Sequence, residues 1–193
     1  MAETPSTMLP LGTQLPQFSL PDLDGTIVSS ESLKGAPALV VAFICPHCPF
    51  VRHLRRGLAA FGADYQNRHV TIVAINSNDT TAYPDDDVAG MKREAESAGY
   101  TFPYLFDQSQ AAAKQFRAAC TPDFFVFDRD GRLVYRGQFD ASRPGNGKPV
   151  TGHDLRAAVD ALIAGTPVAE RQFPSVGCNI KWKPGNAPDY FGG

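Results

Sequence analysis

Two cysteines separated by two residues, in the segment Cys45-Pro46-His47-Cys48, stand between two contrasting hydrophobic patterns. Residues 38–44 before them are continuously apolar, which predicts a central strand buried on both faces of a sheet. From Pro49 onward, apolar residues recur at helical spacing, which predicts a helix with one buried stripe. The members of that stripe are Val51, Leu54, Leu58, Phe61 and Tyr65. The pattern therefore predicts a strand-to-helix junction that carries a pair of thiols at the start of the helix.

This position favours thiol chemistry. The amino terminus of a helix stabilises negative charge, so the first sulfur there is expected to ionise more easily than a free thiol. A thiolate is the species that attacks a disulfide or a peroxide. A Cys-x-x-Cys can also be half of a zinc site, but a second such motif or a His pair is absent, and Cys120 and Cys178 stand alone in the sequence. We interpret the pair as a redox dithiol and expect no metal and no cofactor.

Composition restricts the setting. The chain has 193 residues and a net charge of -2, which suits one soluble domain and gives no indication of a nucleic-acid partner. The longest apolar run, residues 36–44, is too short to span a bilayer, so no membrane association is expected. The amino-terminal residues lack a basic segment followed by an apolar stretch, so we expect a cytoplasmic protein.

The remaining pattern predicts an α/β domain. We expect a flexible leader over residues 1–12, one domain over 13–165 and a carboxy-terminal tail over 166–193 that packs on the domain. Turn signals at Asp-Gly pairs predict hairpins near residues 17–28 and 124–135. Further predicted elements are strands over 70–75 and 103–106, a helix opening at Asp85-Asp86-Asp87, a helix over 109–118 capped by Ser109, and a helix after the capping box Thr151-x-x-Asp154. This order predicts a mixed central sheet with helices on both faces.

Four segments together resemble a known family. They are residues 15–25, the Cys-Pro-His-Cys segment, residues 121–128, and residues 130–137. The chain resembles the redoxins, the branch of thioredoxin-fold proteins that includes alkyl hydroperoxide reductases and thiol-specific antioxidants, over roughly residues 12–165. Within them it is similar to a bacterial subgroup that also carries Ala-Cys-Thr-Pro-Asp-Phe-Phe, here 119–125, and Gly-Cys-x-Ile-Lys-Trp, here 177–182.

The resemblance implies that Pro122 is a cis proline facing the dithiol. A cis bond there would turn the chain sharply and let the Thr121 backbone pair with an extended substrate segment. The alternative is an ordinary trans proline that opens a strand. Thr121 and Pro122 are therefore expected site residues beside the dithiol.

Each residue of the dithiol segment has an expected role. Cys45 is the expected exposed nucleophile, and Cys48, more buried, is the expected resolving thiol. Pro46 and His47 are expected to tune the pair, because an imidazolium at His47 would favour the Cys45 thiolate and make the disulfide more oxidising. The oxidant DsbA has the same tetrapeptide, so we expect a potential between about −120 mV for DsbA and about −270 mV for thioredoxin.

The tail leaves open alternatives. Thioredoxins usually have a Trp before the first cysteine, whereas this chain has Ile44, so Trp182 either folds back over the dithiol or packs elsewhere. Cys120 and Cys178 are possible auxiliary thiols. Either Cys120 is a buried small hydrophobic residue, or the two form a disulfide, or Cys178 exchanges with Cys45 in a relay.

Three functions compete at this stage. The leading hypothesis is a thiol-disulfide oxidoreductase acting on protein or small-molecule disulfides, with a reductant such as thioredoxin or glutathione. The second is an antioxidant thiol peroxidase, although the peroxidase pattern Pro-x-x-x-Thr-x-x-Cys is unmatched because Ala38 and Ala42 occupy the Pro and Thr positions before Cys45. The third is a metal-binding protein using Cys45 and Cys48, with or without Cys120.

Overall fold

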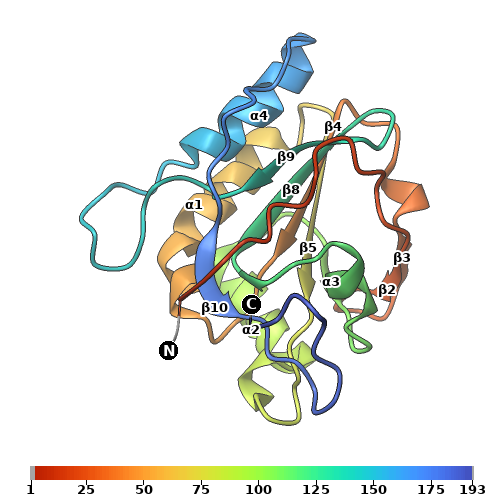
Figure 1. Ribbon diagram of the computed structural model, residues 1–193, viewed down its shortest axis with the longest axis vertical. Coiled ribbons are helices and arrows are strands. Elements are labelled where there is room, and N and C mark those ends of the chain that lie inside the picture. The colour runs from red at the N-terminus through yellow and green to blue at the C-terminus, as the bar shows by residue number, and fades with distance from the viewer. Residues whose placement is uncertain (1–2, 193) are drawn as a thin grey trace.

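A five-stranded mixed sheet forms the centre of the molecule, which is described by a computed structural model for residues 3–192. Strand β4 (Ala38–Phe43) lies in the middle of the sheet (Figure 1). On one side it pairs in parallel with β5 (Val70–Asn76), which pairs in parallel with β6 (Tyr104–Phe106). On the other side it pairs antiparallel with β8 (Asp123–Asp128), which forms a hairpin with β9 (Leu133–Gly137). The predicted α/β class and mixed sheet are confirmed.

Strand β4 is buried on both faces, as its unbroken apolar sequence predicts. Successive side chains of a strand point to opposite faces, so β4 contributes to two separate hydrophobic cores. Val40 packs with α1 (Pro49–Tyr65) and α4 (His153–Ala164) in one core, whereas Val41 packs with α3 (Ala111–Gln115) and the amino-terminal hairpin in the other. The hairpin consists of β2 (Ser19–Pro21) and β3 (Ile27–Ser29).

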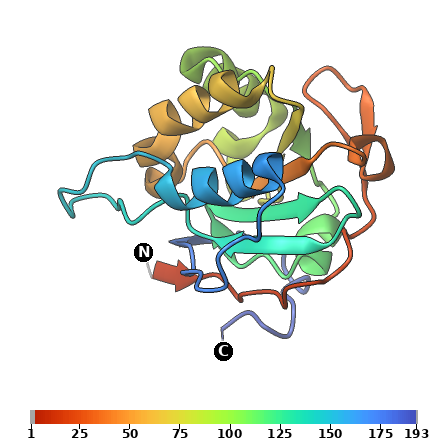
Figure 2. The same ribbon diagram turned by 90° about the horizontal axis from the view of Figure 1, so that it is seen from above.

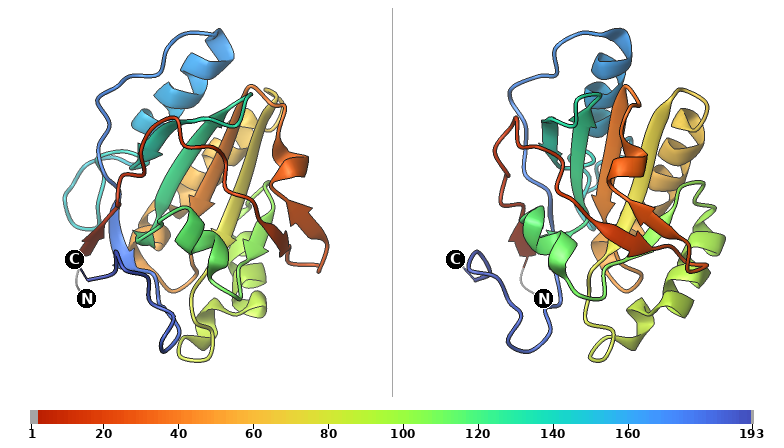
Figure 3. Two further views of the ribbon diagram at one scale, coloured as in Figure 1. Left: turned by 45° about the vertical axis from the view of Figure 1, so that its right-hand side comes forward. Right: turned by 90° about the vertical axis from the view of Figure 1, so that its right-hand side faces the viewer.

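Helices cover both faces of the sheet, as Figures 2 and 3 show. Helices α1 (Pro49–Tyr65), α2 (Val88–Ala98) and α4 (His153–Ala164) lie on one face, and the short α3 (Ala111–Gln115) lies on the other. Two 3-10 turns, η1 (Glu31–Leu33) and η2 (Pro84–Asp86), complete the helical elements of residues 3–192. All five residues of the predicted α1 stripe are buried. Within the described range, none of the helices has the length and apolar character needed to cross a membrane.

Two predicted helix starts are wrong. Helix α3 begins after Gln110, which has a positive φ of 64°, instead of at a Ser109 cap. Helix α4 begins after Gly152, also at positive φ, and the Thr151 hydroxyl accepts only from the His153 amide. In both cases a left-handed residue takes the N-cap position, and the predicted cap stands one residue earlier, where its hydroxyl accepts from the amide of the first helical residue: Ser109 from Ala111 and Thr151 from His153.

A second, three-stranded sheet joins the two ends of the chain. Strand β10 (Val176–Asn179) lies between β1 (Glu3–Pro5) and β7 (Cys120–Thr121), antiparallel to both. The prediction of a flexible leader is thus wrong for residues 3–5, which are held by the tail. Residues 1 and 2 of that leader and residue 193 of the tail lie outside the described residues.

Candidate active site

The dithiol segment follows the carboxyl end of β4 and leads directly into α1. The Ile44 amide donates to the Ile75 carbonyl at 3.0 Å, so the chain is held beside β5 until it reaches Cys45. Cys48 is the N-cap residue of α1 and Pro49 occupies its first turn, where the missing amide hydrogen is not needed. The strand-to-helix junction therefore lies at the residues predicted from the sequence.

Thr121 contacts both sulfurs of the dithiol. Its hydroxyl lies 3.4 Å from Cys45 Sγ, and its carbonyl accepts from Cys48 Sγ at 3.1 Å. The Thr121–Pro122 peptide bond is cis, as the resemblance implied. Cys45 and Cys48 are both fully buried, so the prediction that Cys45 is exposed is wrong.

A buried carboxylate holds the histidine of the dithiol segment. Asp86 accepts from the His47 backbone amide at 3.0 Å and contacts His47 Nδ1 at 2.5 Å. Asn78 donates to the same carboxylate at 2.7 Å, and the side-chain amide of Asn76 donates to the Asp86 carbonyl at 2.7 Å. Sequence reasoning missed Asp86 because the Asp triplet was interpreted as a helix start. The asparagines after β5 were a usable signal, since the carboxyl ends of parallel neighbours β4 and β5 meet at one edge of the sheet.

The charges around the dithiol differ from those predicted. Burial raises the pKa of Cys45 well above its usual range; the hydrogen bond with Cys48 and the Asp86 carboxylate add to this, and the Thr121 hydroxyl opposes it. Hydrogen bonds with Cys178 and with Cys45 lower the pKa of Cys48. In the reduced protein the sulfur with the lowered pKa is therefore Cys48, whereas the sequence predicted Cys45.

Tyr83, and not the tryptophan, lies next to the dithiol segment. Its ring stacks on His47 with the ring centroids 5.2 Å apart, and the Lys181 ammonium lies 5.5 Å from the Tyr83 ring centroid. Trp182 packs instead against the core on the other face of the sheet and contacts Tyr190. Of the two alternatives for Trp182, packing elsewhere is the one observed.

The register of the small sheet separates the two auxiliary cysteines. Cys178 is opposite Thr121, whereas Cys120 is opposite Asn179. Since neighbouring residues of a strand point to opposite faces, Cys178 shares the Thr121 face, which contacts the dithiol, and Cys120 points away. Cys178 forms a hydrogen bond with Cys48, and the Cys120 thiol lies 3.6 Å from the Pro122 carbonyl. The structure contains no Cys120–Cys178 disulfide among its described residues, so that alternative is not the one observed.

One group of metal-ligand types occurs at the site. Donor atoms of Cys45, His47 and Asp86 all lie within 4.8 Å of one another. This set differs from the predicted one, which combined Cys45 with Cys48 and Cys120. Its imidazole Nδ1 is already in contact with the Asp86 carboxylate. The other ring nitrogen, His47 Nε2, is buried and has no hydrogen-bond partner among the described residues.

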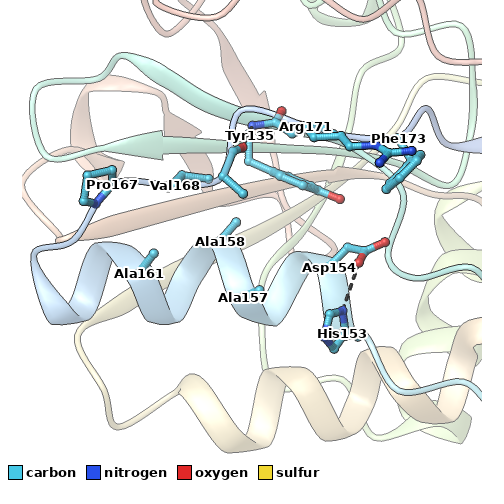
Figure 4. Close-up of a pocket in the computed structure, with 12 residues that line it drawn as sticks. Tyr135, His153, Asp154, Ala157, Ala158, Ala161, Pro167, Val168, Arg171 and Phe173 are labelled. Carbon is cyan, nitrogen blue, oxygen red and sulfur yellow. Dashed lines mark hydrogen bonds and ion pairs between the residues drawn. The ribbon is translucent and has the colours of Figure 1, made fainter.

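Two hollows differ in their relation to the dithiol. A cavity of about 370 Å³ lies between α4 and the segment that follows it, lined by residues such as Tyr135, Ala158 and Phe173 (Figure 4). It contains none of the redox residues. A second hollow of about 350 Å³ borders Pro46 of the dithiol segment. Its charged lining residues are Arg52, Arg55, Arg93, Asp85 and Glu94.

With this geometry established, the chain can be compared with known proteins. Residues 11–136 match the AhpC/TSA family, which is nearly two thirds of the chain. The chain belongs to the AhpC/TSA family. This confirms the predicted resemblance to the redoxins, and the match ends at the second strand of the β8–β9 hairpin. The family assignment therefore covers the dithiol segment, Thr121 and Pro122, but not the tail strand β10.

Similar proteins agree with this assignment. A conserved protein from Geobacillus kaustophilus, described as uncharacterized, is 54% identical, with a TM-score of 0.93 over 95% of this chain and 98% of that one. The thiol-disulfide oxidoreductase ResA of Bacillus anthracis is 25% identical over 130 residues, covering 64% of this chain and 67% of that protein. A secreted disulfide oxidoreductase from Mycobacterium tuberculosis, homologous to E. coli DsbE, shares the thioredoxin fold with a TM-score of 0.58 at 21% identity, covering 77% of this chain and 96% of that one.

Proposed function

We propose that this protein is a thiol-disulfide oxidoreductase in which Cys45 and Cys48 form the redox-active pair. The observation that carries the proposal is the placement of both sulfurs against Thr121 at the start of α1. Family membership and the similarity to ResA support the reaction class. Protein or small-molecule disulfides are the proposed substrates, with thioredoxin or glutathione as the proposed reductant in a cytoplasmic setting.

The hydrogen bond between the two sulfurs suggests how a buried Cys45 becomes a nucleophile. That hydrogen bond places Cys48 Sγ where it can accept the Cys45 proton as Cys45 attacks a substrate disulfide. The attack forms a mixed disulfide and releases one substrate thiolate. Cys48 then loses its proton and attacks Cys45, which forms the Cys45–Cys48 disulfide and releases the second substrate thiol.

The basic hollow beside Pro46 favours a substrate with carboxylate groups. Arg52 is anchored by its own hydrogen bond to the Pro46 carbonyl at 2.9 Å, and Arg93 is exposed at the rim. Guanidinium groups bind carboxylates in a bidentate manner, so an anionic disulfide such as glutathione disulfide is a suitable small substrate.

Disulfide reduction with catalytic variants tests the proposal. Reduced protein should convert glutathione disulfide or insulin to thiols, Cys45→Ser should abolish turnover, and Cys48→Ser should accumulate a mixed disulfide at Cys45. Cys120→Ser is the matched control, because this thiol is also buried but points away from the dithiol. Turnover that survives in Cys45→Ser would contradict the proposal.

One observation favours a second candidate, a thiol peroxidase. The sequence lacks the expected threonine three residues before the peroxidatic cysteine, yet the Thr121 hydroxyl lies 3.4 Å from Cys45 Sγ. A hydroxyl at that distance can hydrogen-bond to a peroxide oxygen during attack. Oxidation of reduced protein by hydrogen peroxide, followed by stopped-flow fluorescence of Trp182, separates the candidates. A rate far above that of a free thiol, lost in Thr121→Val, supports the peroxidase; a free-thiol rate removes it.

A further inference from the structure

The tail strand occupies the backbone that a substrate was expected to use. Thr121 was predicted to pair with an extended substrate segment, but its partner in the structure is Cys178 of β10. Gly177 makes this close approach feasible, because a Cβ at that position would lie 2.0 Å from the Thr121 carbonyl oxygen. The tail therefore presents a cysteine to the dithiol in the manner of a bound substrate.

As a result, three sulfur atoms lie in a row in space, with that of Cys48 in the middle. Cys48 is hydrogen-bonded to Cys45 on one side and to Cys178 on the other. All three side chains are buried, with Cys178 only 2% exposed. The hydrogen bond with Cys48 and burial raise the pKa of Cys178, and the buried Lys181 ammonium, three residues further along the chain, opposes this rise. A central sulfur with a thiol on each side is the arrangement that thiol-disulfide exchange requires.

We propose that Cys178 is a third redox-active thiol that exchanges with the oxidised dithiol at Cys48. The Cys178 sulfur attacks Cys48 Sγ, so the Cys48–Cys178 bond forms while the Cys45–Cys48 bond breaks. Cys45 leaves as a thiolate and takes up the proton that Cys178 loses. One disulfide replaces another, so the step needs no further oxidant or reductant. It differs from the relay considered from the sequence, in which Cys178 exchanged with Cys45.

The exchange gives the oxidised protein a second capability. After the step, Cys45 is again a thiol while the protein still holds a disulfide. It can then attack a second substrate disulfide, which allows rearrangement of substrate disulfides alongside net reduction. This inference rests on the proposed function, because it begins from the Cys45–Cys48 disulfide.

Disulfide mapping tests the exchange. Reduced protein is oxidised with one equivalent of diamide, quenched with acid, alkylated with N-ethylmaleimide and mapped by mass spectrometry. We expect wild type to contain Cys48–Cys178 molecules in which Cys45 is alkylated. We expect Cys178→Ser to contain only Cys45–Cys48, with Cys45 alkylation lost among oxidised molecules, and Cys120→Ser to behave as wild type.

A second variant tests the exchange without relying on Cys178→Ser. Cys45→Ser retains Cys48 and Cys178 and should form their disulfide directly on oxidation. If Cys45–Cys48 forms in wild type but Cys48–Cys178 is missing from both wild type and Cys45→Ser, the exchange is overturned and the proposed function stands. If no Cys45–Cys48 disulfide forms in Cys178→Ser, where the exchange cannot consume it, both are overturned.

Discussion

At the scale of single residues, the Asp86 carboxylate limits the effect that His47 can have on the Cys45 thiol. The sequence suggested that a charged imidazole at His47 would stabilise the Cys45 thiolate. In the structure His47 is paired with Asp86, whose negative charge acts on Cys45 in the opposite direction. The expected effect of the histidine on the potential is therefore weakened by its partner.

Replacing that carboxylate should make Cys45 more reactive. In Asp86→Asn the shape and most hydrogen bonds are retained, but the negative charge that raises the pKa of Cys45 is removed. We expect alkylation of Cys45 by iodoacetamide at neutral pH to become several-fold faster and the redox potential to become more oxidising. Asp85→Asn, a change at the exposed neighbour, is the control. An unchanged alkylation rate in Asp86→Asn would show that Asp86 does not influence Cys45.

Prediction from sequence succeeded at this scale where chemistry is local. The cysteines, Thr121 and Pro122 belong to short motifs with fixed spacing, so their roles could be inferred from the resemblance. Asp86 could not be identified in this way, because it lies 39 residues from His47 and its neighbour Asp87 does act as the cap of α2. Only the fold brings the carboxylate to the dithiol.

At the scale of elements, the tail strand determines the surroundings of the dithiol. Strand β10 has the sequence Val-Gly-Cys-Asn, in which glycine and asparagine have low strand propensity. It exists because its backbone pairs with β1 and β7, which lie far away in the sequence. Local patterns do not contain that information, which explains why the tail was predicted only to pack on the domain.

A methyl group at Gly177 should loosen this strand. The Cβ of Gly177→Ala would lie 2.0 Å from the Thr121 carbonyl oxygen, which is backbone and cannot rotate away. We expect a loss of about 1–3 kcal/mol in the free energy of unfolding, measured by urea denaturation. Val176→Ala, which removes atoms from the same strand without a clash, should lose less. Equal losses in both variants would argue against close packing at Gly177.

Replacing Arg93 of α2 tests whether the basic hollow beside Pro46 binds anionic substrates. Arg93→Gln removes an exposed positive charge near Pro46 without touching the dithiol. We expect KM for glutathione disulfide to rise by about two- to tenfold while kcat and the reduction of an uncharged disulfide stay unchanged. Arg129→Gln, an exposed arginine in the β8–β9 turn, is the control. A parallel loss on both substrates would assign Arg93 a general role instead.

At the scale of the whole molecule, buried carboxyl groups make stability depend on pH. Burial raises the pKa of Asp123 from its ordinary value of 3.8 to about 7, opposed mainly by a hydrogen bond from Ser6. The folded state therefore holds a proton that the unfolded state releases. Stability from this group is fully present below pH 4 and is lost as the pH rises to about 7.

An isosteric amide should remove this dependence. Asp123→Asn retains the acceptor for the Ser6 hydroxyl but cannot ionise. Relative to wild type, we expect the variant to gain about 2–3 kcal/mol in unfolding free energy between pH 5 and pH 8. Urea denaturation at several pH values measures this difference, with the exposed Asp130→Asn as the control. A difference that stays constant with pH would contradict the raised pKa.

The main sheet was predictable at this scale, and the small sheet was not. Each strand of the main sheet was indicated by an apolar run or by an Asp-Gly hairpin signal, and the order of elements along the chain indicated a mixed sheet. The pairing of residues 3–5 with residues 176–178 depends on the completed fold, so no local pattern indicates it.

The occupation of Thr121 by β10 has a consequence for which substrates can be handled. An extended polypeptide that adds to this edge has to displace the tail first, together with the pairing of β1 on its other side. A compact disulfide does not need to pair with the Thr121 backbone, so it has no such requirement. We therefore expect the protein to reduce small disulfides faster than protein disulfides for as long as the tail stays in place.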